Sequence, residues 1–359
     1  MARDHEVMVL VPRAMSLKSL TRRTSPEGIC NEADEVIPKV CSYAYNWLPG
    51  STRCAMRAYV RAATAGLKRI EKTWGRPDLI HAHVVMPAGW SAAKLGQRFG
   101  IPVVLTEHTS PFSNHLRTRM DQIRVRRTLE ACAGVVALSR SLAADMKDFA
   151  GDQQIEVIGE IVEEPGAEDR NPDADQAESP IKIAFVGGLR RQKGVTYLLQ
   201  AVARLVKGGL DLEVVLAGAG PLEKDLERTA DSLEIGERCR FSGLLSRSEV
   251  FHLLSSSDLL VVSSIHETFC LAAAEAIACG KPVVVTRCGG PEHFVSPENG
   301  IVVKVGDSEA LARGIQTVIQ RFDSYDSEVM KENITSAYGP AAFLEKINRV
   351  YRKAVSSTE

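Results

Sequence analysis

The sequence of 359 residues lacks several features that would assign it to a class at once. It has no run of about 18 apolar residues, so we predict no membrane-spanning segment. Its eight cysteines show no C-x-x-C spacing, and we predict buried thiols in a reducing cytoplasm. The first residues, "MARDHEVMVLVPRA", place acids before the apolar run and lack a small-residue cleavage site, so we do not expect a signal peptide.

The chain also lacks the motifs that identify a nucleotide site on their own. Neither G-x-G-x-x-G nor G-x-x-x-x-G-K-[ST] occurs, and there is no short-period repeat or low-complexity tract. No platform of aromatic and basic residues is present, so we expect no nucleic-acid partner. The function must therefore be sought in a combination of weaker signals.

The charge that is present is unevenly distributed. Apolar residues make up 45% and charged residues 25% of the chain, as in soluble globular proteins, and the length suffices for two domains. Residues 1–155 contain 22 basic and 14 acidic residues, a net charge of +8, whereas the remainder carries −9. A basic half favours a phosphate-bearing partner or a membrane surface, and scattered surface charge is the alternative.

Short β-branched runs alternate with helix-like segments along both halves of the chain. This alternation is typical of βαβ units with a parallel sheet. We therefore predict an α/β protein with two Rossmann-like, doubly wound parallel sheets. The predicted strands are residues 5–12, 78–85, 101–108 and 134–139 in the first half, and 181–189, 212–220, 238–243, 258–264, 281–287 and 300–305 in the second.

A stretch rich in proline and acids separates the two halves. We predict an N-terminal domain over residues 1–158, a linker over 159–180 and a second domain over 181–339. The "DAD" sequence in the linker follows no apolar strand, so we read it as solvated acids and not as a metal site. Residues 340–359 include an amphipathic helix, whose apolar side is formed by Phe343, Leu344, Ile347, Val350 and Tyr351.

Three glycine-containing corners lie where predicted strands of the second half pass into helices. Ligands of open parallel sheets bind outside the carboxyl ends of the strands, where glycine lets the backbone approach and cations can neutralise a diphosphate. Glycine at one such corner more often reflects plain turn chemistry, whereas three corners in one domain, one of them basic, favour phosphate binding. The residues are Gly187 and Gly188 followed by Arg190, Arg191 and Lys193, then Gly218 and Gly220, then Gly289 and Gly290.

The sequence "HETFCLAAAEA" places two carboxylates eight residues apart, Glu267 in a turn before a predicted helix and Glu275 inside it. Eight residues is just over two turns, so we expect both acids on about the same face. Glu267 would face a ligand at the helix N-terminus, and Glu275 could accept hydrogen bonds from a ribose. The alternative is a first-turn acid favoured by the helix dipole and an unrelated second acid, but an unpaired carboxylate among alanines is costly.

These residues resemble glycosyltransferase family 4, retaining enzymes of the GT-B fold that use nucleotide-sugar donors. The resemblance is carried by "FVGGL…KG", "AGAGPL", "FSGLLSRSEV", the two glutamates and "GGPEHFVSPENGIVVKVGD", and is strongest over residues 181–307. In the first half, "DLIHAHVVMPAGWSAAKLGQRFGIPVVLTEH" and "VVALSRSLAADM" are also similar. The resemblance implies two domains that face each other across a cleft, with the C-terminal helix packing back on the N-terminal domain.

The resemblance implies a donor site in the second domain. Glu275 would bind the ribose hydroxyls, and Glu267 would lie beside the sugar and the diphosphate. Lys193, with Arg190 or Arg191, would hold the diphosphate and stabilise its departure, so neither a metal nor a cofactor is expected. The other implied donor-binding groups are the amides of Phe269 and Cys270 and the glycines Gly187, Gly188, Gly218 and Gly220.

It also implies residues of the N-terminal domain. His83 would lie near the reacting sugar, with a packed or capping histidine as the alternative, and His81 is expected to be structural. Glu107 and His108, at the end of the next strand, are candidates for the acceptor side. A basic segment would suit an anionic lipid surface or a polyprenyl-diphosphate acceptor, with a solvated helix face as the alternative; its residues are Arg117, Arg119, Arg124, Arg126 and Arg127.

The chain departs from the family pattern in three places. Gly188 stands where Arg is usual, so the diphosphate cation must come from Arg190 or Arg191. Glu160 stands where Asn is usual. Residues 2–13 resemble the family's second strand, and its first strand, glycine-rich loop and helix are missing; either the true start lies upstream, which we favour, or the N-terminal domain is reduced.

We therefore predict a retaining, metal-independent hexosyltransferase of the cytoplasm, with the inner face of the membrane as a further expected location. It would transfer a sugar from a UDP- or GDP-sugar to a hydroxyl acceptor, for example a lipid-linked one, in glycolipid, polysaccharide or cell-envelope glycan synthesis. The reaction would take place on one face of the sugar, with the leaving diphosphate helping to take the acceptor proton. The alternatives are a nucleotide-sugar 2-epimerase and a truncated, non-catalytic nucleotide-sugar-binding protein.

Overall fold

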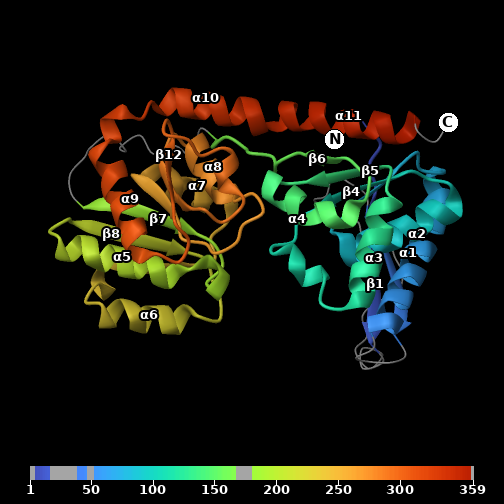
Figure 1. The fold of residues 1–359 in the computed structure, drawn as a ribbon, viewed down its shortest axis with the longest axis horizontal. Coiled ribbons are helices and arrows are strands. Elements are labelled where there is room, and N and C mark those ends of the chain that lie inside the picture. The colour runs from blue at the N-terminus through green and yellow to red at the C-terminus, as the bar shows by residue number, and fades with distance from the viewer. Residues whose placement is uncertain (1–4, 17–38, 47–51, 167–179, 357–359) are drawn as a thin grey trace. The chain divides into compact units, whose positions relative to one another are not determined.

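The computed structural model describes residues 5–16, 39–46, 52–166 and 180–356. The chain divides into two compact units (Figure 1). Unit 1 comprises the chain up to Ala137, residues 143–157 and the segment from Leu344 onward, and unit 2 comprises residues 138–142 and 158–343. Both contain parallel sheets with helices in the connections, which confirms the predicted α/β class with two Rossmann-like units.

In unit 1, four parallel strands form one sheet in the order β3-β4-β5-β6. Every residue of β4 and β5 is buried, as expected for inner strands of a parallel sheet covered on both faces. The strands are β3 (Ile80–His83), β4 (Val103–Glu107), β5 (Gly134–Ala137) and β6 (Ile155–Val157), and the connecting helices are α2 (Trp90–Phe99), α3 (Arg119–Glu130) and α4 (Arg140–Ala150).

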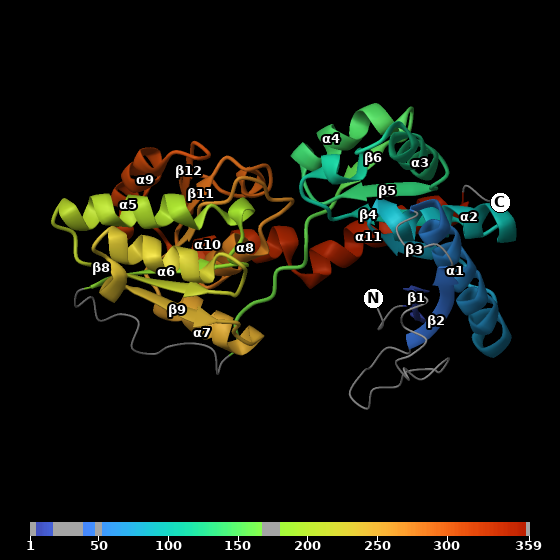
Figure 2. The ribbon, with the colours of Figure 1, turned by 90° about the horizontal axis from the view of Figure 1, so that it is seen from below.

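A separate parallel pair of strands precedes this sheet in the chain. It consists of β1 (Val9–Ser16) and β2 (Lys39–Asn46), and helix α1 (Thr52–Trp74) packs against it (Figure 2). A Cβ atom added at Gly66 of α1 would lie 2.2 Å from Cδ1 of Leu10. Helix α1 can therefore pack this close to β1 only because residue 66 is glycine. The sequence predicted the strands at β1, β3, β4 and β5, but not β2, β6 or α1.

In unit 2, six parallel strands form one sheet in the order β12-β11-β10-β7-β8-β9. All six strands predicted for the second half are confirmed. Strands β8 and β9 lie on one side of β7, and the later strands β10, β11 and β12 lie on its other side. The strand order therefore reverses between β7 and β10. The strands are β7 (Ile181–Val186), β8 (Leu212–Ala217), β9 (Cys239–Gly243), β10 (Leu259–Val262), β11 (Val283–Thr286) and β12 (Gly300–Val303).

The helices of unit 2 form two groups. Helices α5, α6 and α9 share one buried apolar core with the sheet, and α8 packs against both α7 and α10. None of the helices in the described part of the chain combines the length and apolarity that a membrane crossing requires. The helices are α5 (Val195–Lys207), α6 (Glu223–Ser232), α7 (Arg247–Ser256), α8 (Leu271–Ala278), α9 (Ser308–Gln320) and α10 (Ser327–Tyr338).

The C-terminal helix α11 (Pro340–Ser356) joins unit 1 from Leu344 onward. It buries Ile347, Val350 and Ala354, whereas Phe343, Leu344 and Tyr351 of the predicted apolar side are half-buried. A Cβ atom at Gly134, the first residue of β5, would lie 2.8 Å from Cγ1 of Val350. This glycine therefore lets α11 lie close to the sheet.

The described cysteines are all free thiols. Cys41, Cys132, Cys270, Cys279 and Cys288 are buried, and the other two, Cys54 and Cys239, are half-buried. The "DAD" sequence of the linker lies outside the described residues.

Candidate active site

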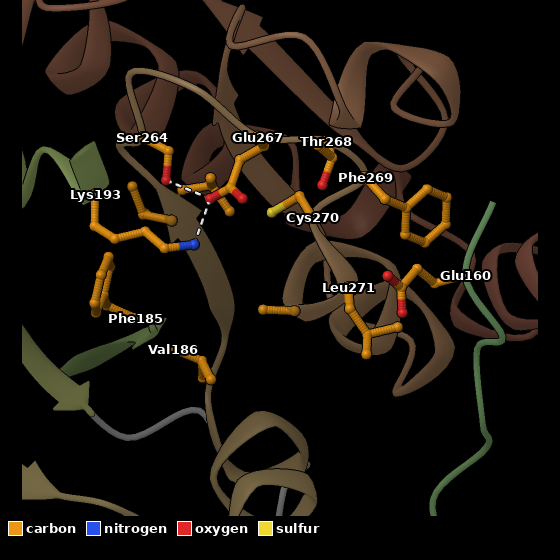
Figure 3. Close-up of a pocket in the computed structure, with 13 residues that line it drawn as sticks. Glu160, Phe185, Val186, Lys193, Ser264, Glu267, Thr268, Phe269, Cys270 and Leu271 are labelled. Atoms are coloured by element: carbon orange, nitrogen blue, oxygen red, sulfur yellow. Dashed lines mark hydrogen bonds and ion pairs between the residues drawn. The ribbon is translucent and has the colours of Figure 1, made fainter. Parts of the chain in front are cut away.

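A pocket of about 240 Å³ lies in unit 2 at the carboxyl ends of β7 and β10 (Figure 3). This is the place where the strand order reverses, and open parallel sheets bind ligands at such a point. The ends of the two strands contribute Phe185 and Val186 from β7, and Val261 and Val262 from β10. The other lining residues are Glu160, Lys193, Ser264, Glu267, Thr268, Phe269, Cys270, Leu271 and Ala272.

An ion pair between Lys193 and Glu267 forms the charged part of the pocket. Nζ of Lys193 donates a hydrogen bond to Oε1 of Glu267 at 2.7 Å, and Oγ of Ser264 donates to the same oxygen at 2.6 Å. The side chains of Lys193 and Glu267 are 31% and 12% exposed. Burial alone would lower the pKa of Lys193, but the charge of Glu267 and its hydrogen bond outweigh burial and raise that pKa. Lys193 is therefore a fixed, fully charged cation.

The backbone before α5 holds Lys193 against the end of β10. Oγ of Ser263 donates to the carbonyl oxygen of Lys193 at 2.8 Å, and the amide of Ile265 donates to the carbonyl of Gln192 at 2.7 Å. Gly194 has φ +62°, and a Cβ atom there would lie 2.1 Å from the carbonyl oxygen of Ser263. Only glycine fits this approach, so the glycine of the "KG" sequence serves to place the lysine.

The segment before α8 is equally constrained. The amide of Glu267 donates to the carbonyl of Cys288 at 2.8 Å, and Cys270 caps the helix with left-handed angles of φ 74° and ψ 67°. A Cβ atom at Gly290 would lie 2.7 Å from the backbone of Phe269. Phe269 and Cys270 line the pocket at the electropositive start of the helix.

Glu275 lies one turn into α8 and is not among the residues that line the pocket. Its side chain is 7% exposed, and its Oε1 atom lies 2.9 Å from Nη2 of Arg247. The expectation that Glu267 and Glu275 share a helix face assumed that helical turns can be counted from Glu267, and this assumption was wrong. Because α8 begins only at Leu271, after the left-handed Cys270, helical turns cannot be counted from Glu267.

The glycines in the corners after β7 and β8 differ in how closely neighbouring atoms surround them. A Cβ atom at Gly218 would lie 2.0 Å from the carbonyl oxygen of Gly187, and one at Gly220 would lie 2.3 Å from that of Leu189. These two glycines allow the two corners to pack on each other. At Gly188 the nearest atom to an added Cβ would be 3.7 Å away, so this position has room for a side chain. None of the four glycines in these two corners lines the pocket.

Arg190 and Arg191 follow in the same loop as Lys193. Both side chains are exposed, and neither makes an ion pair with a described residue. They do not line the pocket, so the structure brings Lys193 to Glu267 and leaves the two arginines beside it in the loop.

In unit 1, three histidines lie together at the carboxyl ends of β3 and β4. Nδ1 of His83 lies 2.9 Å from Nε2 of His108, and the rings of His81 and His83 stack at 4.5 Å. His81 contacts Oγ1 of Thr106 at 2.8 Å and the hydroxyl of Tyr351 at 2.7 Å. Burial, with smaller contributions from His83 and His108, lowers the pKa of His81 to about 3. His81 therefore stays neutral, whereas His83 is exposed.

Glu107, at the end of β4, is completely buried. Its carboxylate accepts hydrogen bonds from the amides of Val85 at 2.6 Å, His108 at 2.9 Å and Thr109 at 2.7 Å. Burial alone would raise its pKa, but the His115 imidazole, Thr109 and the Val85 amide lower it. Glu107 is thus a saturated anchor of the backbone, and its carboxylate does not face the surface as an acceptor-side residue would.

The turn that Glu107 holds contains a strained residue. Val84, directly after His83, has φ 72° and ψ 126°, a conformation that a β-branched residue adopts only under constraint. Its amide donates to the carbonyl of Thr106 at 2.8 Å, and its own carbonyl accepts from the amide of Gly89 at 2.9 Å. With the bond from Val85 to Glu107, these contacts fix the backbone that presents His83.

The predicted basic segment runs from Arg117 into α3. Arg124 pairs with Asp121 at 2.9 Å, whereas four other arginines of the segment are exposed, and so is Met120, at 49%. The exposed arginines are Arg117, Arg119, Arg126 and Arg127.

Sequence reasoning missed Ser264, Thr268 and Arg247. Ser264 could have been found as a polar residue at the carboxyl end of a predicted strand, but Arg247 has no local signal because its partner lies in another helix. Within the described ranges, no group of three or more His, Cys, Asp and Glu side chains is arranged to hold a metal ion.

Two family models match the chain. Residues 1–163 match the model described as glycosyltransferase family 4, and residues 168–335 match that of glycosyl transferases group 1. A D-inositol 3-phosphate glycosyltransferase of Salinispora arenicola is 30% identical over 308 residues, which cover 76% of this chain and 68% of the relative. Other relatives are matched over 35% to 73% of their own length.

Solved structures share the fold. Sucrose-phosphate synthase of Thermosynechococcus elongatus superimposes with a TM-score of 0.79 at 21% identity, over 99% of this chain and 90% of that one. The Anabaena protein HepE in complex with UDP-glucose gives 0.67 at 19% identity, over 89% and 86%. At such identities the likeness establishes the fold alone.

Proposed function

Because this chain belongs to the family 4 glycosyltransferases, we propose that it transfers a sugar from a nucleotide-sugar donor to a hydroxyl acceptor, with retention of configuration and without a metal ion. The observation that carries the proposal is the Lys193–Glu267 ion pair in the pocket at the strand-order reversal of unit 2. A fixed cation at the start of a helix is suited to a diphosphate, because the helix N-terminus and the ammonium group both favour negative charge there.

Several neighbouring groups support a donor at this pocket. Arg190 and Arg191, exposed in the same loop, supply further positive charge for the diphosphate. At about 240 Å³ the pocket suits a phosphate and a sugar ring better than a whole nucleotide-sugar, so the nucleoside would extend beyond it. We assign the ribose hydroxyls to Glu275, one turn further along α8. HepE, which shares the fold, is described with UDP-glucose bound, and this supports a nucleotide-sugar as donor.

In the proposed reaction, the bond between the anomeric carbon and the diphosphate oxygen breaks while the acceptor oxygen bonds to that carbon on the same face. The acceptor proton passes to the leaving diphosphate. Lys193 stabilises the charge that develops on the diphosphate, and Glu267 holds the ammonium group of Lys193 in place. From the family resemblance we also propose that His83, which the strained turn at Val84 presents to solvent, takes part in the reaction.

We propose that the acceptor is a polyol or a lipid-linked hydroxyl compound, as in glycolipid, polysaccharide or cell-envelope glycan synthesis. The similar enzyme of Salinispora arenicola is described as acting on D-inositol 3-phosphate, a phosphorylated polyol. The four exposed arginines of the basic segment would suit an anionic acceptor or an anionic lipid surface.

The experiment that tests the proposal is calorimetric titration of the 359-residue chain with UDP, GDP and ADP, with Glu275→Ala as the control. Binding of one nucleotide, weakened in Glu275→Ala, would support the donor site and identify the base. The corresponding nucleotide-sugar would then be incubated with and without acceptors. Release of free nucleotide and free sugar with no need for an acceptor would instead favour the epimerase, and no nucleotide binding by a folded chain would overturn the donor assignment.

A further inference from the structure

Helix α7 brings one arginine to the buried glutamate of α8. The two helices pack on each other, and α7 begins at Arg247. Ser246 caps α7: its Oγ atom accepts from the amide of Glu249 at 3.3 Å, and its own amide donates to Oε2 of Glu249 at 2.7 Å. This reciprocal capping box fixes the backbone from which the Arg247 side chain extends.

The guanidinium group of Arg247 is held on three sides. Nη2 lies 2.9 Å from Oε1 of Glu275, and Nε donates to Oε2 of Glu163 at 2.9 Å. Its Cζ atom lies 5.2 Å from the centroid of the Phe251 ring, one turn further along α7. A planar fork that meets two carboxylates through different nitrogens has a defined orientation, which a single surface ion pair does not.

Glu275 needs such a partner. Its carboxylate is 7% exposed, in a helix stretch otherwise made of alanine, leucine and isoleucine. Burial raises its pKa, Arg247 opposes that rise, and Glu163 and Glu160 add to it through their negative charges. Without Arg247, Glu275 would lose the cation that opposes the effect of burial, and its pKa would rise further.

We propose that Arg247 is a positioning residue for the nucleotide donor, which holds the carboxylate of Glu275 so that its second oxygen can accept hydrogen bonds from a pair of ligand hydroxyls. This inference rests on the proposed function, because it takes the ligand to be a nucleoside diphosphate. Arg247 itself does not line the pocket and acts through Glu275. Glu163, from the segment that follows β6, is the second support that keeps the guanidinium group in place.

The test is calorimetric titration of the full chain with the nucleoside diphosphate that the parent binds, at pH 7.5 and at pH 5.5. Arg247→Met keeps the stem over Phe251 and removes the charge. We expect roughly tenfold weaker binding at pH 7.5, in line with the loss of a hydrogen bond to a charged group. The deficit should grow at pH 5.5, because a Glu275 without its cation is protonated at higher pH than in the parent.

Two further variants calibrate the result. Arg247→Lys restores a charge without the fork and should recover part of the affinity and most of the parent's pH dependence. Arg313→Met removes an arginine of comparable exposure, which pairs with Glu309 on α9, and should leave binding unchanged. In transfer assays the loss in Arg247→Met should appear in KM for the donor far more than in kcat, since Arg247 does not touch the reacting atoms.

Several outcomes would overturn the inference. Equal or tighter binding by Arg247→Met would mean that the arginine competes with the nucleotide for Glu275. An equal deficit at both pH values would mean that Arg247 contacts the nucleotide directly. If Arg247→Met does not fold, Glu163→Gln tests the same support, with an expected loss of about two- to threefold; an unchanged affinity there would count against it. No binding by the folded parent would overturn the proposed function itself.

Discussion

Two glutamates at the carboxyl ends of parallel strands have opposite surroundings. Glu107 follows β4 of unit 1, is completely buried and accepts three hydrogen bonds from backbone amides. Glu267 follows β10 of unit 2, is 12% exposed and is bonded by the side chains of Lys193 and Ser264 at the edge of a pocket. The position in the fold therefore does not decide the role. A carboxylate saturated by amides supports the backbone, whereas one paired with side chains at a pocket holds a charged group where a ligand can reach it.

The largest expected effect is on the stability that Glu107 provides. Glu107→Ala should lower the free energy of unfolding by about 3–5 kcal/mol, because it leaves buried amides without acceptors. Urea unfolding followed by circular dichroism measures the change. A loss below about 1 kcal/mol would show that water or a neighbouring group replaces the carboxylate, and the contrast with Glu267 would then fail.

The same residue gives a prediction for pH. Since the pKa of Glu107 is lowered in the folded protein, its ionised form stabilises the fold above the pKa of the unfolded chain, and this contribution is lost as the pH falls. Between about pH 5 and pH 3, the stability of the parent should fall more steeply than that of Glu107→Gln. Parallel slopes for the two proteins would contradict this assignment.

Lys193, the partner of Glu267, should show the reverse pattern. Lys193→Met should slow sugar transfer by roughly 10²–10³-fold, the usual effect of removing one group that stabilises charge in a transition state. It should cost about 1 kcal/mol of stability or less, because the side chain is almost one-third exposed. Initial rates at saturating donor, together with a melting curve, separate the two effects. A variant with a clearly lower melting temperature but an unchanged transfer rate would assign Lys193 a structural role instead.

The glycine corners extend the comparison to the backbone. Gly220→Ala should destabilise unit 2 by about 1–3 kcal/mol, because the added methyl would overlap the backbone of Leu189. Gly188→Ala, in the adjacent corner, meets nothing closer than 3.7 Å and should change the stability by less than about 0.5 kcal/mol. Thermal unfolding of the two variants side by side measures the difference in stability. Equal melting temperatures would contradict the predicted contrast between the two glycine positions.

The smallest expected effect concerns the room left at Gly188. Gly188→Arg places a third arginine in the loop beside Lys193, with no overlap at Cβ. We expect it to tighten nucleoside diphosphate binding by about three- to tenfold at low salt, and less at high salt, because exposed charges are screened. Unchanged affinity at low salt would show that this position lies too far from the diphosphate.

The sequence predicted more of unit 2 than of unit 1. Apart from β9, the strands of unit 2 are mainly apolar runs, and glycine begins, ends or directly follows several of the six, so local patterns identified all of them. The partnership of Lys193 with Glu267 joins residues 74 positions apart, and that of Arg247 with Glu275 joins two helices, so the residues could be named but not their contacts. The saturation of Glu107 depends on a turn whose geometry no spacing encodes, so the sequence could present Glu107 only as a candidate for the acceptor side.

The strained turn at Val84 has a consequence for laboratory evolution. Glycine adopts its backbone angles without the cost of about 1–3 kcal/mol that such conformations carry for other residues. A selection for thermal tolerance alone should therefore enrich Val84→Gly. If His83 has the role proposed above, a selection for catalysis should disfavour the same change, because a looser turn no longer aims its imidazole. Running both selections on one library, and counting glycine codons at this position, would show whether rigidity here serves folding or turnover.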